Sequence, residues 1–197
     1  FENSARQAMV LDHPGILQVL EEGHWNGRPY LAMPYLPGGD LRERILGQCP
    51  LEPETAVDLV LQILDGLEEM HRRGLVHRDL KPANILFDEA GLPRIADLGL
   101  AELAGIREGT ELSTVQGTAG YASPEQIRGA PAAPQQDLYA VGALLAALVS
   151  GADPPNQAAI PRPLRPLVDW CTQAEPQRRP DSVASLREAL QTFRRTS

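Results

Sequence analysis

Residues 77–84 read HRDLKPAN, which places a carboxylate, two cations and a carboxamide within eight positions. Asp79 can accept or orient a proton, and Lys81 can steady an anionic group during its transfer. Asn84 and Asp97 lie thirteen residues apart and offer the hard oxygen ligands that Mg²⁺ prefers. Any one of them alone would be an ordinary polar loop residue, but that explanation is poor for all four together.

The composition is that of a soluble globular protein and limits the partners to expect. The 197 residues are 43% apolar and 22% charged, which suits one domain or part of a larger one. The net charge of −8, from 26 acidic and 18 basic residues, argues against a dedicated nucleic-acid surface. Because Phe1 stands where a Met would begin a complete chain, we expect these residues to be part of a longer protein.

Cysteine usage and hydropathy indicate a cytoplasmic protein. Cys49 and Cys171 lie far apart without CxxC spacing, so neither a structural disulfide nor a zinc site is expected. The longest apolar run, 138–149, is too short to span a bilayer and predicts a buried helix instead. A membrane anchor elsewhere in the parent protein is left open.

Hydrophobic periodicity and turn residues predict a mostly helical chain with two small hairpins. The clearest helix lies within 51–74, where apolar residues recur every three or four positions and Gly74 closes the helix. Asn26-Gly27 predicts the turn of one hairpin, and DEAG (88–91) that of the other. Other segments are expected to be helices over 1–11, 41–46, 135–150, 167–174 and 183–193, and a long functional loop over 99–122. The predicted N-caps are Asp40, Ser123 and either Asp181 or Ser182.

Several motifs, taken in order, resemble the signature set of the protein kinases. HRDLKPAN is followed by Asp97 in DLG and by GTAGYASPE (117–125), the order of that family's catalytic loop, DFG motif and APE motif. HRDLKP with GT ahead of the terminal Glu is similar to the Ser/Thr branch. HPGIL, LPGGDL, DLG and SPEQ resemble the bacterial eukaryotic-like (Hanks-type) kinases, and the resemblance runs from Phe1 to about Phe193.

This resemblance implies a mainly α fold, that of a kinase C-terminal lobe, which belongs to an α+β enzyme in the complete kinase. Residues 1–36 would be a remnant of the N-lobe with the end of its C helix, a hairpin and the hinge, and 37–197 would be the C-lobe. The implied activity is Mg²⁺-dependent transfer of the γ-phosphoryl group of ATP to a Ser or Thr hydroxyl of a protein substrate. A kinase dimer for autophosphorylation is left open as a further partner.

The resemblance also implies roles for single residues. Asp79 and Lys81 would be catalytic, while Asn84 and Asp97 would bind Mg²⁺ and ATP. Thr118 would hydrogen bond to Asp79 and Lys81. Phosphoryl transfer depends on positioning and charge neutralisation, and these residue types supply both.

Other motif residues would hold this site in place. Asp137 would anchor the backbone of the catalytic loop, Glu125 would pair with Arg179, and His77 would be a packed ring rather than a base. The remaining histidines receive no role: His13, His24 and His71.

On the nucleotide side, Met33 would be the gatekeeper and 34–36 the hinge. Pro34 has no N–H, but this first hinge position offers adenine only its carbonyl oxygen, and the N–H comes from Leu36. Leu86, two residues beyond Asn84, would form the apolar floor under the base.

The long loop carries candidate regulatory hydroxyls. Arg78 directly precedes Asp79, and in relatives this pairing marks kinases that are switched by phosphorylation of the loop. The candidate phosphosites are Thr110, Ser113 and Thr114. A phosphate there would add charge and acceptors that an Arg side chain can grip.

Three departures from the family pattern keep other functions open. Neither G-x-G-x-x-G nor the V-A-I-K lysine occurs in these residues, so we expect residues 1–197 alone to be nearly inactive. Ser4 stands where the family's C-helix glutamate is expected, and 151–179 leaves little room for a G helix. The alternatives are a pseudokinase, which binds or scaffolds without turnover, and a domain fragment with no function alone.

Overall fold

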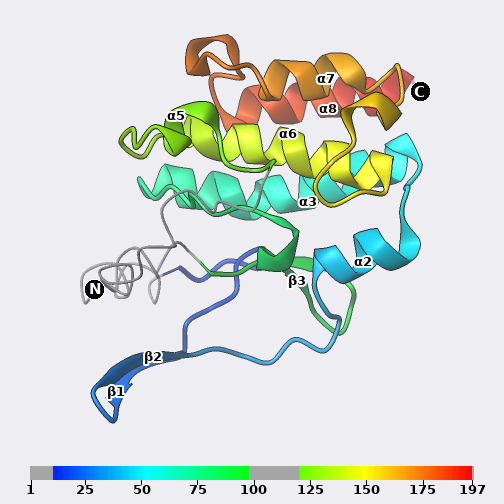
Figure 1. Ribbon diagram of the computed structural model, residues 1–197. Coiled ribbons are helices and arrows are strands. Elements are labelled where there is room, and N and C mark those ends of the chain that lie inside the picture. Colours follow the sequence, from blue (N-terminus) through cyan, green and yellow to red (C-terminus); the bar gives the residue numbers. More distant parts are fainter. Residues whose placement is uncertain (1–10, 98–119, 197) are drawn as a thin grey trace.

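The computed structural model describes residues 11–97 and 120–196, and the account that follows concerns these residues (Figure 1). The α-helices are α2 (Leu41–Gln48), α3 (Pro53–Arg72), α5 (Pro124–Ile127), α6 (Pro134–Ser150), α7 (Arg165–Cys171) and α8 (Val183–Thr196). The 3-10 turns are η1 (Pro82–Asn84), η2 (Gln157–Ala159) and η3 (Pro176–Arg178), and the strands are β1 (Glu21–Trp25), β2 (Arg28–Ala32), β3 (Ile85–Phe87) and β4 (Pro93–Ile95). The predicted mainly helical fold with two small antiparallel sheets is confirmed.

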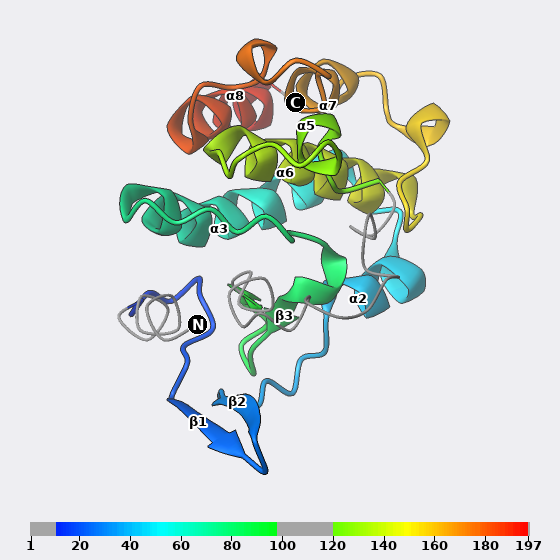
Figure 2. The same cartoon turned by 60° about the vertical axis from the view of Figure 1, so that its left-hand side comes forward.

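Two long helices, α3 and α6, form the centre of the molecule. They lie side by side, with α7 and α8 covering one side of the pair and the β3–β4 hairpin on the other side of α3 (Figure 1, Figure 2). The inward stripe of α3 includes Val57, Val60, Leu64 and Leu67, none of which is exposed. Full burial of each such side chain stabilises the fold by about 1.5–3 kcal/mol.

Helix α6 is buried nearly all round, as its continuous apolar sequence predicted. It packs closely on α7 at Gly142, where an added Cβ would collide with Cys171 and touch Thr172. Gly151 ends the helix in the left-handed region at φ 65°, and its N–H donates to the carbonyl of Ala147.

The two hairpins have different surroundings. In β1–β2 the turn residues Asn26 and Gly27 have φ of 51° and 75°, as the predicted tight turn requires. This hairpin projects away from the helices (Figure 1, Figure 2). The β3–β4 hairpin is built into the fold, because Ile95 bridges to Ile16 and lies against α3.

Some predicted helix ends agree with the structure, while α8 runs on to Thr196, three residues beyond the predicted 193. Asp40 caps α2 through a 2.8 Å bond from Glu43 N, and Ser123 caps α5. Of the two candidates for α8, Ser182 is the cap, since it accepts from Ser185 N. Helix α7 runs over Arg165–Cys171 instead of the predicted 167–174. Pro166 is tolerated in its first turn, and the helix ends at the C-cap Thr172, whose backbone leaves the helical conformation.

Several other expectations can be compared with the described residues. Both cysteines are free thiols. Between Gly151 and Leu164, a segment described throughout, the only helical element is the three-residue turn η2. Among the described residues, no helix has the length and apolar character needed to cross a membrane. The helix predicted over 1–11 falls almost wholly on residues outside the described part.

Candidate active site

The backbone of the HRDLKPAN loop is fixed by hydrogen bonds to one carboxylate of α6, that of Asp137. Asp137 is 1% exposed, and its two oxygens accept hydrogen bonds from His77 N at 2.9 Å and Arg78 N at 2.8 Å. Arg78 has a left-handed backbone with φ 65°, which such fixed N–H groups help to maintain. Asp137 lies in the first turn of α6, where negative charge is also favoured by the helix dipole.

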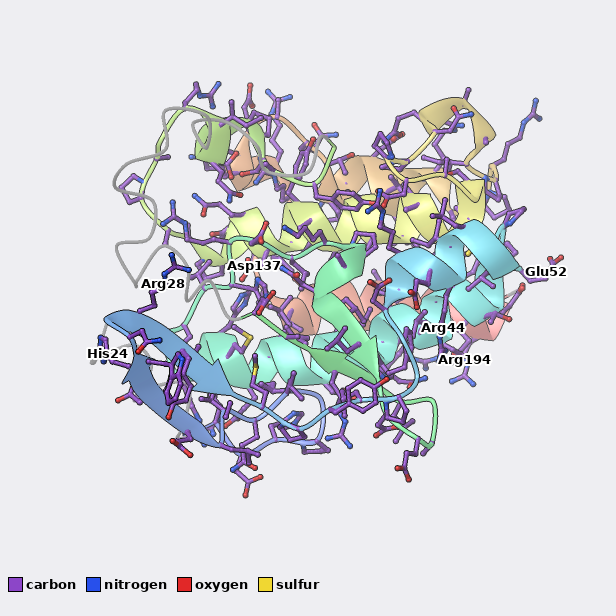
Figure 3. All side chains as sticks on the ribbon, turned by 60° about the horizontal axis from the view of Figure 1, so that its bottom comes forward. His24, Arg28, Arg44, Glu52, Asp137 and Arg194 are labelled. Atoms are coloured by element: carbon purple, nitrogen blue, oxygen red, sulfur yellow. The ribbon has the colours of Figure 1, made fainter. Side chains whose placement is uncertain are left out.

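A residue that sequence analysis passed over, His71, completes this anchor. Its Nε2 lies 2.8 Å from Oδ2 of Asp137, and its side chain is only 11% exposed (Figure 3 labels Asp137). His71 sits in the last turn of α3, so the contact ties the two central helices to the HRDLKPAN loop. The available signal was its place on the apolar stripe of α3, seven residues beyond Leu64.

His77 links the HRDLKPAN loop to the DLG segment. The ring is fully buried, with Nε2 2.9 Å from the carbonyl oxygen of Ala96. Its Nδ1 accepts from Asp79 N at 3.2 Å. Because Nδ1 is an acceptor, Nε2 carries the proton and donates to Ala96, which fixes the neutral tautomer. The ring therefore connects the segments that carry Asp79 and Asp97.

Asp79, Lys81 and Asn84 form one connected cluster. Oδ2 of Asp79 accepts from Lys81 Nζ at 2.8 Å and from Asn84 Nδ2 at 3.1 Å. The Asn84 amide also donates to the backbone carbonyl of Asp79 at 2.8 Å. The side chains of Asp79 and Lys81 remain 32% and 23% exposed, so the cluster is ordered but open to a ligand. Within the described parts of the chain, Oδ1 of Asp79 has no hydrogen-bond partner.

The same cluster leaves oxygen atoms suited to a hard cation. Since Asn84 Nδ2 is used by Asp79, the amide oxygen of Asn84 is left for another ligand. Ala96 N donates to the Asn84 carbonyl at 2.8 Å, which brings the neighbouring Asp97 to this edge of the loop. Asp97 is exposed, with φ 54°, and makes no ion pair with any described residue. A carboxamide and a carboxylate oxygen fit Mg²⁺, which takes few protein ligands together with phosphates.

Glu125 of α5 and Arg179, which follows η3, form a buried bidentate ion pair. Arg179 Nη1 and Nη2 donate to the two carboxylate oxygens at 2.6 and 2.7 Å. Burial by itself would raise the pKa of Glu125, but the bonds from Arg179 and Ser123 outweigh burial and lower it. Arg179 also donates to the carbonyls of Gln135 and Gln173, so one guanidinium joins α5, α6 and the chain before η3.

Comparison with known proteins identifies the family. The family profile described as "Protein kinase domain" matches residues 3–192, nearly the whole chain. The chain belongs to the protein kinase family. The predicted resemblance is thereby confirmed, and the HRDLKPAN cluster lies within the matched region of this kinase.

Relatives of this kinase are bacterial Ser/Thr kinases. Serine/threonine-protein kinase PknL of Mycobacterium tuberculosis is 38% identical over 154 residues, 78% of this chain and 39% of that protein. Serine/threonine-protein kinase PrkC of Bacillus subtilis is 36% identical over 154 residues, 78% of this chain and 24% of that protein. Probable serine/threonine-protein kinase PknB of Lactococcus lactis is 33% identical over 154 residues, 78% of this chain and 25% of that protein. The chain thus spans well under half the length of these relatives.

The segment that follows β2 is joined to β3 through two glycines. Gly38 N donates to the Phe87 carbonyl, and Phe87 N donates to the Gly39 carbonyl, both at 3.0 Å. A Cβ on Gly38 would lie 2.5 Å from that Phe87 oxygen, and Gly39 has φ 70°, so both positions favour glycine. This pairing brings the segment after the predicted hinge alongside β3, which carries the half-buried Leu86. Arg44 of α2 covers the Phe87 ring at 3.2 Å from its centroid (Figure 3 labels Arg44).

The predicted hinge residues lie between the first hairpin and this glycine pair. Met33 is half-buried and packs against the core, while Pro34 is exposed and Leu36 half-buried. No described backbone bond occupies the N–H of Leu36, which is the group expected to face adenine.

One further contact in this kinase had no sequence signal. The side-chain amide of Gln126 in α5 donates to the carbonyl of Arg78, which ties the α5 segment directly to the catalytic loop. Gln126 follows Glu125 directly. Two neighbouring residues of α5 therefore bind different parts of the molecule: Gln126 binds the HRDLKPAN loop and Glu125 binds Arg179. The other predicted site residues lie outside the described part of the chain: Ser4, Thr110, Ser113, Thr114 and Thr118.

Proposed function

We propose that this kinase domain transfers the γ-phosphoryl group of ATP to a Ser or Thr hydroxyl of a protein. The observation that carries the proposal is the Asp79–Lys81–Asn84 cluster on a loop anchored by Asp137. Family membership and the names of its relatives support the same activity. The two free cysteines support the further proposal that the domain works in the reducing cytoplasm.

In the proposed reaction, Asp79 orients the acceptor hydroxyl and receives its proton at Oδ1. A bond forms between the acceptor oxygen and the γ-phosphorus, the bond from that phosphorus to the β–γ bridging oxygen breaks, and ADP leaves. Lys81, held 2.8 Å from Asp79, lies where it can neutralise charge on the transferring group.

Asn84 and Asp97 are the residues proposed to hold Mg²⁺ through their side-chain oxygens. When bound, Mg²⁺ supplies charge neutralisation at the phosphate oxygens. Met33, the Pro34 carbonyl, the Leu36 N–H and Leu86 are proposed to receive the adenine. Residues 1–36 and 37–197 are proposed as N-lobe remnant and C-lobe, with the base between them.

The test is Mg²⁺-dependent phosphoryl transfer by the full-length protein from labelled ATP to a Ser/Thr peptide library. Asp79→Asn should lower kcat by roughly 100-fold or more, because positioned proton transfer is lost. The matched control is Asp88→Asn, which removes a carboxylate paired with Arg94 in the β3–β4 turn, outside the proposed machinery. Wild-type protein that turns over no ATP would overturn the proposal.

The second candidate function is a pseudokinase, which the Ser4 substitution favours. A protein of that kind binds nucleotide without phosphorylating peptides, so ATP binding in calorimetry together with no phosphoryl transfer to the peptide library would identify it. The expectation that residues 1–197 alone turn over ATP weakly stays a prediction. Comparing these residues with the full-length protein in the same assay tests it.

A further inference from the structure

A hollow of about 250 Å³ lies where α2, α3 and the β3–β4 turn meet. Its apolar lining comes mainly from leucines: Leu41 and Leu148 are fully buried, while Leu51 and Leu59 are half-buried. None of the lining residues belongs to the Asp79 cluster or to the predicted adenine site. The hollow therefore has no part in the proposed function.

Arg44 brings a positive charge without a counter-ion to this hollow. Its guanidinium makes no ion pair or hydrogen bond with any other described residue, and Cζ lies 3.2 Å from the centroid of the Phe87 ring. Burial lowers the pKa of Arg44, as expected for a cation that has lost water without gaining an anionic neighbour. A guanidinium that lies by its face over a ring keeps its N–H donors at the edge, where they fit a carboxylate.

The remaining charges around this hollow do not neutralise Arg44. Asp58 is the one carboxylate among the described residues that line it, and its Oδ1 lies 2.8 Å from Nε of Arg194. Arg194 thus adds a second cation close to the rim (Figure 3 labels Arg44 and Arg194). One carboxylate with two arginines leaves a local positive excess in a chain whose net charge is −8, so the hollow favours an anion.

A second hollow, of about 380 Å³, adjoins the first along α3. Gln62 lines both hollows, and Gly91 of the first is followed directly by Leu92 of the second. Leu92 is 49% exposed, so an apolar side chain is offered to a partner between them. Two adjoining hollows suit an extended peptide better than a small molecule that fills only one of them.

The acidic residues of the second hollow are already paired. Asp65 and Glu68 lie 2.7 and 2.9 Å from the guanidinium nitrogens of Arg187. Glu69 is 2.8 Å from Arg72. Across the two hollows, Arg44 is therefore the one arginine without an ionic partner among the described residues, and it sets the charge that a partner must carry.

We infer that the first hollow is a docking site for a peptide segment of a partner protein in which a Glu or Asp stands next to a branched apolar residue. The carboxylate accepts hydrogen bonds from the edge of the Arg44 guanidinium. The apolar side chain packs on Leu51 and Leu59, and the peptide continues past Gln62 towards the second hollow. The inference concerns binding alone and does not depend on phosphoryl transfer.

The experiment measures peptide binding to the full-length protein by fluorescence polarisation in the absence of ATP. Three labelled peptide pools share one fixed Leu and differ in the fixed residue after it, which is Glu, Gln or Lys. All other positions are random mixtures of uncharged residues. Wild-type protein should bind the Leu-Glu pool at least about tenfold more tightly than the Leu-Gln pool, because only the carboxylate forms a charge-assisted bond. The Leu-Lys pool should bind most weakly.

Three variants assign the preference to the hollow. Arg44→Gln should remove the preference for Glu over Gln, and Arg44→Glu should reverse it in favour of the Leu-Lys pool. Thr55→Trp fills the hollow from an exposed position of α3 and should weaken the binding of all three pools by about tenfold or more. The matched control is Arg28→Gln, which removes an exposed cation of β2 and should leave the preference unchanged.

The outcomes decide the inference separately from the proposed function. Folded Arg44→Gln protein that still prefers the Leu-Glu pool overturns the inference, and so does loss of the preference in Arg28→Gln. Self-association of wild type that Arg44→Gln removes in sedimentation equilibrium assigns the hollow to a second copy of this chain and overturns it too. If Arg44→Gln fails to melt cooperatively, Thr55→Trp decides the question. Because the assay contains no ATP, a failure of phosphoryl transfer overturns the proposed function alone.

Discussion

Glu125 and Arg179 meet through two hydrogen bonds of 2.6 and 2.7 Å, although 54 positions separate them in the chain. The Arg179 side chain is completely buried and the Glu125 side chain is 11% exposed. The pair joins the end of the DLG-to-SPE segment to the C-terminal helices. The pair therefore holds α5, which contacts the HRDLKPAN loop, in place without contacting the proposed ligands itself.

Removing Arg179 should destabilise the fold strongly. Arg179→Ala leaves the Glu125 carboxylate buried without its partner, so we expect a loss of about 3–5 kcal/mol in the free energy of unfolding. Urea denaturation of wild type and Arg179→Ala measures this difference in the free energy of unfolding. The control is the neighbouring Arg178→Ala, whose side chain is 68% exposed and should cost at most about 0.5 kcal/mol. Equal effects of the two changes would contradict the assigned role.

The same pair should make stability depend on pH. The folded protein lowers the pKa of Glu125, so its contribution is complete above the ordinary carboxyl range and is lost as pH falls through the folded-state value. Between about pH 6 and pH 3, wild-type protein should lose more stability than Glu125→Gln. If the stabilities of wild type and Glu125→Gln fall in parallel as the pH is lowered, the prediction is wrong. The control is Glu175→Gln, which removes the carboxylate of the exposed Arg178–Glu175 pair.

Asp97 should be needed for metal-dependent turnover and not for folding. Because Asp97 is exposed and makes no ion pair with described residues, Asp97→Asn should change the free energy of unfolding by less than about 0.5 kcal/mol, since Asn also tolerates the left-handed backbone at φ 54°. Mg²⁺-dependent ATP turnover by the full-length protein should nevertheless be abolished. Retained turnover in a folded variant would remove Asp97 from the proposed metal site.

The two thiols should differ in reactivity. Cys171 is 1% exposed, and burial raises its pKa to about 12, so little thiolate forms in the native protein. Burial also raises the pKa of Cys49. This thiol is only half-buried, however, so reagents can still reach it. Timed labelling at about pH 8 should modify Cys49 first and Cys171 only with unfolding. Modification of both at one rate in native protein would show that α7 opens readily.

Phosphorylation of the long loop stays a prediction from the sequence. We expect at least one of Thr110, Ser113 and Thr114 to be phosphorylated in active full-length protein, with the two threonines favoured. Mass spectrometry of active protein locates the modification, and a triple-alanine variant measures its effect. An unmodified loop together with full activity of that variant would leave Arg78 a structural residue.

Local chemistry in the sequence was sufficient for many of the elements and for the grouping of Asp79, Lys81 and Asn84. The stripe of α3, the Asn26-Gly27 turn and the caps at Asp40 and Ser123 depend on neighbours within a few positions, which the sequence displays directly. Asp79, Lys81 and Asn84 are likewise within six positions of each other, so their order and types alone were informative.

Tertiary structure decided which distant groups share a partner. His71 and His77 meet Asp137 across 60 or more positions, Gln126 reaches the Arg78 carbonyl, and Asp153 joins Tyr121 to Arg42. Sequence spacing carries no signal for such contacts, because they depend on how α3 and α6 pack and where connecting segments cross them. The pairing of Glu125 with Arg179 came from family resemblance, but its burial, which makes the pair costly to break, is set by the packing of α5, α6 and the segment around η3.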